Sequence, residues 1–233
     1  MAEWLAFARG PLFRLSVAVM VLGLARHLAV TVWGLIRAYR LSDDKNVSWR
    51  RAAHQTLDWL VPVRHLRERW FYSLMSVIFH IGVIVTPVFL LAHIRLLQKS
   101  IGVAWWALPM TAADVLTLTT VVTLLLLISG RVGSGAARGI SRLQDYAIPG
   151  LIVVPFLSGF LAAHPGLNPF PYNPTMLVHI LSADLCIVLV PFTKLAHMAL
   201  LPLSQLPSEL AWRFPPDYPE RVARQIGTQG RAI

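Results

Sequence analysis

The chain has 233 residues, of which 56% are hydrophobic and only 14% are charged. A soluble domain of this length would carry about 25% charged residues, so the composition excludes an ordinary soluble protein and indicates a polytopic membrane protein. The formal net charge of +10 falls mainly between the apolar runs, which favours membrane topology over nucleic-acid binding as its cause. The single cysteine, Cys186, excludes an internal disulfide and a cysteine-ligated zinc or iron–sulfur site within this chain.

Five apolar runs approach the roughly 20 residues that are needed to cross about 30 Å of hydrocarbon. They predict an all-α fold, a polytopic bundle of five transmembrane helices at about 11–36, 71–97, 112–129, 146–163 and 175–201. The N-terminus lacks the basic-then-apolar order and the small-residue cleavage site of a signal peptide, so we expect the first helix to remain in the mature protein. We predict a membrane domain over residues 1–203 and a cytoplasmic C-terminal tail over 204–233.

The distribution of lysine and arginine predicts the orientation, because cytoplasmic loops are enriched in both. The first connection, the third connection and the tail are rich in arginine. The connection between spans two and three has only Lys99, with Arg95 at its edge, and "HPGLNPFPYNP" between spans four and five has no charge. With five spans, this pattern places the N-terminus outside and the C-terminus in the cytoplasm.

The long first connection, about 40–70, has a helical pattern of its own. Its apolar residues recur at steps of three and four, namely Trp49, Ala52, Ala53, Leu57 and Leu60. This periodicity indicates either a helix that lies on the cytoplasmic membrane interface or one that docks against a cytoplasmic partner.

Five of the eight histidines fall within the predicted spans: His27, His80, His93, His179 and His197. Polar side chains at bilayer depth are costly, and they usually face a bundle interior, a cavity or a cofactor. On a continuous helix, His179 and His197 would be five whole turns apart, on one face and about 27 Å from each other. Span two runs in the opposite direction, so depth in the membrane pairs His80 with His197 and His93 with His179.

Two histidine pairs stacked across a membrane are what two b-type haems require, with one neutral imidazole on each face of each porphyrin. Ligands at opposite depths cannot share one tetrahedral zinc ion. The geometry of span two is less regular, because thirteen residues rotate His93 about 140° around a straight helix from His80. Pro87 in span two and Pro191 in span five predict kinks that would alter this relation.

The segments "FHIG" at Phe79–Gly82 and "PFTKLAH" at Pro191–His197 resemble the haem-ligand segments of the respiratory nitrate reductase gamma subunit. That superfamily includes the membrane cytochromes b of heterodisulfide reductase and of the sulfite-reductase-linked membrane complex. The resemblance covers residues 71–203 and the five-span, N-outside topology. In the nitrate reductase branch the helix-two histidines are ten residues apart, whereas position 90 here is leucine. This departure favours a relative with another partner.

The resemblance implies a five-helix dihaem cytochrome b in a prokaryotic cytoplasmic (inner) membrane. The resemblance implies His80, His179 and His197 as metal ligands and two haem b as the cofactors. Depth in the membrane adds His93 as the fourth metal ligand. The leading hypothesis is an electron-transfer subunit of a quinone-linked respiratory oxidoreductase complex, which is not catalytic on a soluble substrate alone. Its outer haem would exchange electrons with a quinone, and its inner haem with a cytoplasmic iron–sulfur subunit, since this chain lacks cysteines for a cluster of its own.

Other polar residues have two interpretations each. Arg26 and His27 are expected to contact haem propionates or a neighbouring helix, and His27 is also an alternative haem ligand. Lys194 and Arg95 are candidates to neutralise propionates, unless their stems only snorkel to the interface. Lys99 is a candidate quinone contact, with Asp114 nearby as a proton acceptor, unless Lys99 is an ordinary solvated residue.

Two competing functions remain open from the sequence. In a transporter or channel, the intramembrane Asp184, Lys194 and the histidines would form a proton or ion path without haem. In a purely structural anchor, no cofactor would be present. His164, in the outer loop, is expected only to be solvated.

Overall fold

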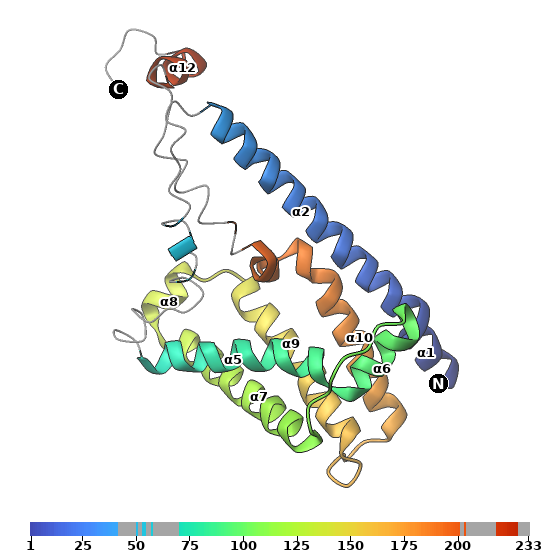
Figure 1. Ribbon diagram of the computed structural model, residues 1–233. Coiled ribbons are helices and arrows are strands. Elements are labelled where there is room, and N and C mark those ends of the chain that lie inside the picture. The colour runs from blue at the N-terminus through green and yellow to red at the C-terminus, as the bar shows by residue number, and fades with distance from the viewer. Residues whose placement is uncertain are drawn as a thin grey trace. The chain divides into compact units, whose positions relative to one another are not determined.

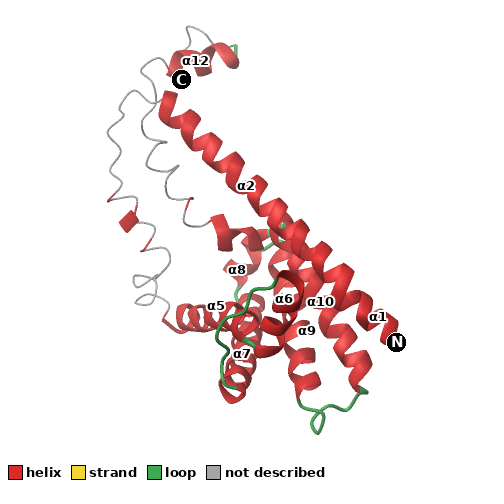
Figure 2. Cartoon of the chain, turned by 45° about the vertical axis from the view of Figure 1, so that its right-hand side comes forward, coloured by secondary structure: helices red, strands yellow, loops and turns green. Residues whose placement is uncertain are grey.

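The computed structural model describes residues 1–41, 50, 53–54, 57, 70–200, 203 and 218–227. Over this part of the chain, all regular secondary structure is helical (Figures 1 and 2). Five of the described helices are long and apolar enough to cross a membrane, at Ala2–Arg40, Trp70–Phe89, Met110–Gly133, Gln144–Ala163 and Tyr172–Phe192. The predicted all-α class and the five apolar spans are confirmed, and the N-outside orientation stays a prediction.

Contacts divide the chain into two units, which are 1–22 with 63–195, and 23–62 with 196–233. The helix α2 (Phe13–Leu41) begins in the first unit and continues into the second. The predicted interfacial helix at 49–60 lies mostly outside the described residues. Of the predicted tail, the structure describes residues 218–227, which include the helix α12 (Tyr218–Gln225).

The first unit contains the helices that matter for the site. In chain order these are α1 (Ala2–Phe7), the π-helix η1 (Ala8–Leu12), α5 (Trp70–Phe89), α6 (Leu91–Ile101), α7 (Met110–Gly133), α8 (Gly135–Ile140), α9 (Gln144–Ala163) and α10 (Tyr172–Leu189). α5 packs on α7, α7 on α9, and α9 on α10, which also contacts α1 and η1 (Figure 1). Each long helix after the first therefore packs on its neighbour in the sequence.

Small side chains line the contact between α5 and α7. Thr117, Thr120 and Thr123 of α7 are buried, and each hydroxyl donates a hydrogen bond to a carbonyl of its own helix. Gly82 of α5 faces Thr120 so closely that any side chain at position 82 would overlap the threonine hydroxyl. Small residues let membrane helices approach closely where no hydrophobic effect drives them together. Gly82 and Thr120 therefore set the spacing of α5 and α7.

Two spans that were predicted as continuous helices are interrupted in the structure. The span predicted at 71–97 breaks at Leu90, whose backbone is extended (φ −73°, ψ 126°) between α5 and α6. α5 continues through Pro87, so the predicted kink at this proline is replaced by a break three residues later. Pro87 lacks the N–H that would bond to the carbonyl four residues earlier, so it disturbs the turn before it and not the turn at Leu90. The break therefore has another cause.

The span predicted at 175–201 ends as an α-helix at Leu189. It continues as the 3₁₀ turns η2 (Val190–Phe192) and η3 (Lys194–Ala196), with Thr193 extended between them. Pro191 lacks an N–H and clashes with a helical carbonyl, which explains the interruption. A 3₁₀ turn has a different rise and rotation from an α-turn. The continuous α-helix from His179 to His197 that the prediction assumed is therefore interrupted.

Candidate haem site

The break at Leu90 frees carbonyl groups that find new donors. A helix end leaves its last carbonyls without intrahelical partners. The carbonyls near the end of α5 accept hydrogen bonds from the side chains of His93 and Trp105 and from the backbone of Leu108. Their respective acceptors are Pro87 (3.0 Å), Val88 (2.9 Å) and Phe89 (2.9 Å). Donors from beyond α5 thus stabilise the break, which Pro87 alone does not produce.

The break brings His93 beside His179 of α10. The two imidazole rings are nearly parallel, with 8° between their planes and 5.9 Å between their centroids. The adjacency of this pair, predicted from membrane depth, is confirmed. The role of the two rings as haem ligands stays a prediction.

Both rings are anchored through the same atom to a proline carbonyl. Nδ1 of His93 donates to Pro87 at 3.0 Å, and Nδ1 of His179 donates to Pro155 of α9 at 2.8 Å. A neutral imidazole that donates from Nδ1 carries its lone pair on Nε2. His93 lies outside the five apolar helices, and its removal from water lowers its pKa, which favours the neutral ring. Both histidines therefore present Nε2 as the nitrogen that can bind a metal.

Gly159 of α9 makes room for the ring of His179. A β-carbon at position 159 would lie 2.7 Å from Cε1 and 2.8 Å from Nδ1 of His179. Gly159 lies one turn after Pro155, the residue whose carbonyl holds His179. One turn of α9 therefore supplies both the acceptor for the ring and the space that it occupies.

These residues fit a six-coordinate haem iron. Histidine nitrogens are common ligands of haem iron, and both of these parallel rings keep Nε2 as the nitrogen that carries the lone pair. Metal-bound histidines usually donate their second N–H to a carbonyl or carboxylate, as both rings do here.

The second predicted pair, His80 and His197, is divided between the two units. Nδ1 of His80 donates to the carbonyl of Ser76 at 2.7 Å, and its ring meets Phe79 edge-on with centroids 5.1 Å apart. His80 therefore has the same anchoring as His93 and His179. His197 belongs to the second unit, and its pairing with His80 stays a prediction.

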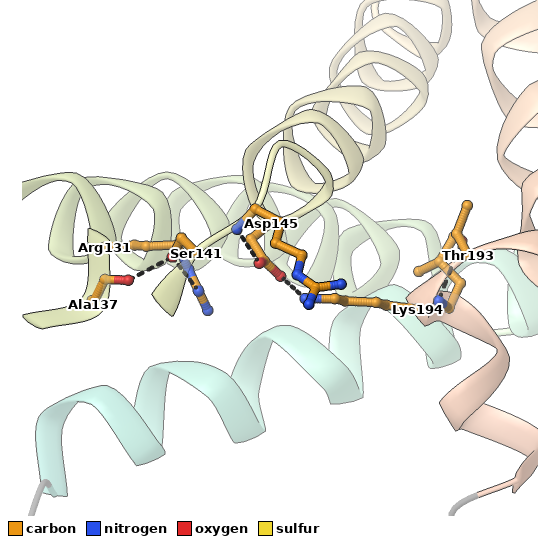
Figure 3. Close-up of polar contacts among 8 residues, drawn as sticks. Arg131, Ala137, Ser141, Asp145, Thr193 and Lys194 are labelled. Carbon is orange, nitrogen blue, oxygen red and sulfur yellow. Dashed lines mark hydrogen bonds and ion pairs between the residues drawn. The ribbon is translucent and has the colours of Figure 1, made fainter. Parts of the chain in front are cut away.

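Lys194 forms an ion pair with Asp145 at the start of α9 (Figure 3). Its Nζ lies 2.5 Å from Oδ1, while Oδ2 accepts a hydrogen bond from the backbone N–H of Arg142 at 2.8 Å. In the same view Arg131 donates to the hydroxyl of Ser141 at 3.0 Å. Lys194 thus has a protein carboxylate as a partner, and its predicted role toward a haem propionate stays a prediction.

The remaining predicted residues lie on two helices. Arg26 and His27 belong to the second unit, on α2, and Arg26 is exposed. Arg95 and Lys99 are exposed on α6. The predicted roles of all four stay predictions.

His164 is more than a solvated residue, which corrects the expectation from the sequence. Its Nδ1 donates to the carbonyl of Phe160 at 2.9 Å, and its Nε2 lies 3.2 Å from Oδ2 of Asp114. A lone histidine in a polar loop gives no sequence signal for such a contact, because the partner lies 50 residues away on α7.

Arg9 is a second residue that the sequence did not single out. It lies in η1, which packs against α10, the helix that carries His179. It is exposed and follows the buried Ala8. The contact between the first and last apolar helices brings Arg9 to the helix of His179. Hydropathy along the chain does not reveal such a contact.

A protein of Nitratidesulfovibrio vulgaris (strain Hildenborough), described simply as "Protein", is 31% identical to this chain over 205 residues. The match covers 86% of this chain and 89% of that protein. No family model matches the chain, and no solved structure matches it.

Proposed function

This chain belongs to one family with the Nitratidesulfovibrio vulgaris protein, and we propose that it is a dihaem cytochrome b subunit of a respiratory membrane complex. It passes electrons between a membrane quinone and a cytoplasmic iron–sulfur subunit. The observation that carries the proposal is the parallel pair His93 and His179 at 5.9 Å, with both Nδ1 atoms anchored to proline carbonyls.

The residues of this chain bind and orient the cofactors. His93 and His179 hold the outer haem, and His80 and His197 hold the inner one. When bound, the haems supply the one-electron redox chemistry. The carbonyls of Pro87, Pro155 and Ser76 fix which ring nitrogen is available, as outer-shell partners of metal ligands do.

Charged residues complete the proposed sites. Propionates of a buried haem need cationic partners. Arg26, His27 and Lys194 are the proposed partners, with Lys194 held by Asp145 at the start of α9. Lys99, at the end of α6 beyond His93, is the proposed hydrogen-bond donor to the quinone.

The arginine-rich segments support a cytoplasmic partner on one side of the membrane. Arg131 lies in the last turn of α7, and Arg138 and Arg142 follow between α7 and α9. The connection between α9 and α10 has no Lys, Arg, Asp or Glu. A basic surface favours encounter with an acidic protein. The chain has one cysteine, so the iron–sulfur cluster belongs to that partner.

A reduced-minus-oxidised visible spectrum of the purified full chain tests the proposal. We expect two b-type haems per chain. A colourless protein, purified from cells that load other b-type cytochromes, would overturn the proposal.

An ion-translocating protein without haem is the competing function, and one observation favours it. Asp184 in α10 is 4% exposed, and its Oδ2 has no hydrogen-bond partner among the described residues. Ionisable groups at such positions often mark ion or proton paths. The same spectrum separates the two functions, because only the cytochrome requires haem.

A further inference from the structure

An ion pair joins the beginning of α7 to the end of α9. Nε2 of His164 lies 3.2 Å from Oδ2 of Asp114, and the two side chains are 28% and 26% exposed. The ring of His164 stacks on Phe160, with centroids 4.3 Å apart and 27° between the planes. Stacking, the bond to the Phe160 carbonyl and partial burial fix the ring, while solvent still reaches the pair.

The hydrogen bonds determine where the pair carries its proton. A carbonyl can only accept, so Nδ1 of His164 must be the donor to Phe160. Nε2 and Oδ2 are then both acceptors unless one proton lies between them. The contact therefore holds one proton, as imidazolium with carboxylate or as imidazole with carboxylic acid.

The pair lies at the same end of the first unit as the His93–His179 site. Leu108, which bonds the last carbonyl of α5, is six residues before Asp114. On α9, nine residues separate His164 from Pro155, whose carbonyl holds His179. Nine residues of helix rise about 14 Å, which is the separation along α9 between His164 and the residue that holds His179.

We propose that Asp114 and His164 form the proton-transfer site between the quinone and the outer water. The inference rests on the proposed function and adds to it the route of the protons. Oxidation of a quinol to a quinone releases two electrons, which pass to the b-type haems, and two protons. The pair gives its shared proton to outer water, and the resulting negative charge draws one quinol proton onto Nε2. The second proton follows by the same route, and quinone reduction uses the route in reverse.

The experiment measures reduction of the haems by duroquinol in stopped flow, using the full chain in detergent. The variants are Asp114→Asn and His164→Ala. Glu3→Gln is the matched control, because it removes an exposed carboxylate in the first turn of α1 that takes part in neither the Asp114–His164 ion pair nor the proposed haem sites. We expect at least a tenfold slower haem reduction in both variants, with unchanged haem content, and the wild-type rate in the control. Added imidazole should restore the rate of His164→Ala, because it replaces the lost proton carrier.

The outcomes separate this inference from the function on which it rests. If duroquinol fails to reduce haem in the wild type, both the quinone-linked function and this inference are overturned. Unchanged reduction rates in both variants overturn the inference alone. A slowed rate that imidazole leaves slow, with a lower melting temperature, shows that the pair only joins α7 to α9, which also overturns it.

Discussion

The ring of His179 occupies the space in which a side chain at position 159 would begin, with its Cε1 only 2.7 Å from that point. Gly159→Ala should therefore displace the ring from the Pro155 carbonyl and from His93. We expect loss of the outer haem, seen as about half of the wild-type haem absorbance per chain in the difference spectrum. Gly150→Ala is the matched control on the same helix, since a β-carbon there meets nothing within 4 Å. Equal haem content in the two variants would contradict this placement of His179.

His93→Ala should abolish the outer haem, because it removes the ring that lies 5.9 Å from His179. His27→Ala, on α2, should leave both haems in place. Redox titration of the difference spectrum distinguishes one remaining haem from two. The reverse pattern would assign the outer ligand to α2.

His197→Ala should remove the inner haem and leave most of the outer one. The reason is the proposed pairing with His80, which is anchored to Ser76 like the other ligands. Potentiometry of the variant should show one redox transition in place of two. Retention of both transitions would refute His197 as a ligand.

Gly82→Ala should destabilise the packing of α5 on α7, because the added methyl group overlaps the hydroxyl of Thr120. Overpacking of this kind costs about 1–3 kcal/mol. We expect a lower midpoint in denaturant unfolding followed by far-UV circular dichroism in detergent. Gly130→Ala, with open space around position 130 on α7, should keep the wild-type midpoint, and an equal midpoint for Gly82→Ala would contradict the close approach.

Lys99→Ala should slow quinol-dependent haem reduction while both haems stay bound. Lys99 lies in the last turn of α6, beyond His93 and at the edge of the apolar region. Stopped-flow traces with a short-chain quinol measure the effect, and the difference spectrum controls for haem content. Unchanged quinol kinetics would remove Lys99 from the quinone site.

The sequence predicted the parts of the fold that depend on composition and depth. The five apolar helices follow from hydropathy. The adjacency of His93 and His179 follows from antiparallel spans, since depth in a membrane restricts which residues can meet. The site of the break at Leu90 could not be predicted, because its carbonyls are satisfied by donors up to 19 residues later in the chain.

The contact between His164 and Asp114 was missed for a similar reason. It depends on how the ends of α7 and α9 meet, which hydropathy does not encode. Gly159 and Arg9 were missed because their importance depends on which face of α9 and η1 meets α10. Tertiary packing, rather than local propensity, decides all of these contacts.

The packing of α10 against α1 and η1 has a consequence for biogenesis. α7, α9 and α10 can each pair with the preceding long helix as they leave the ribosome and enter the bilayer. The N-terminal segment that carries Arg9 must wait beside the insertion machinery until α10, more than 160 residues later, has been made. The surroundings of His179 are therefore completed last, so loading of the proposed haem at this histidine should follow synthesis of the whole membrane domain.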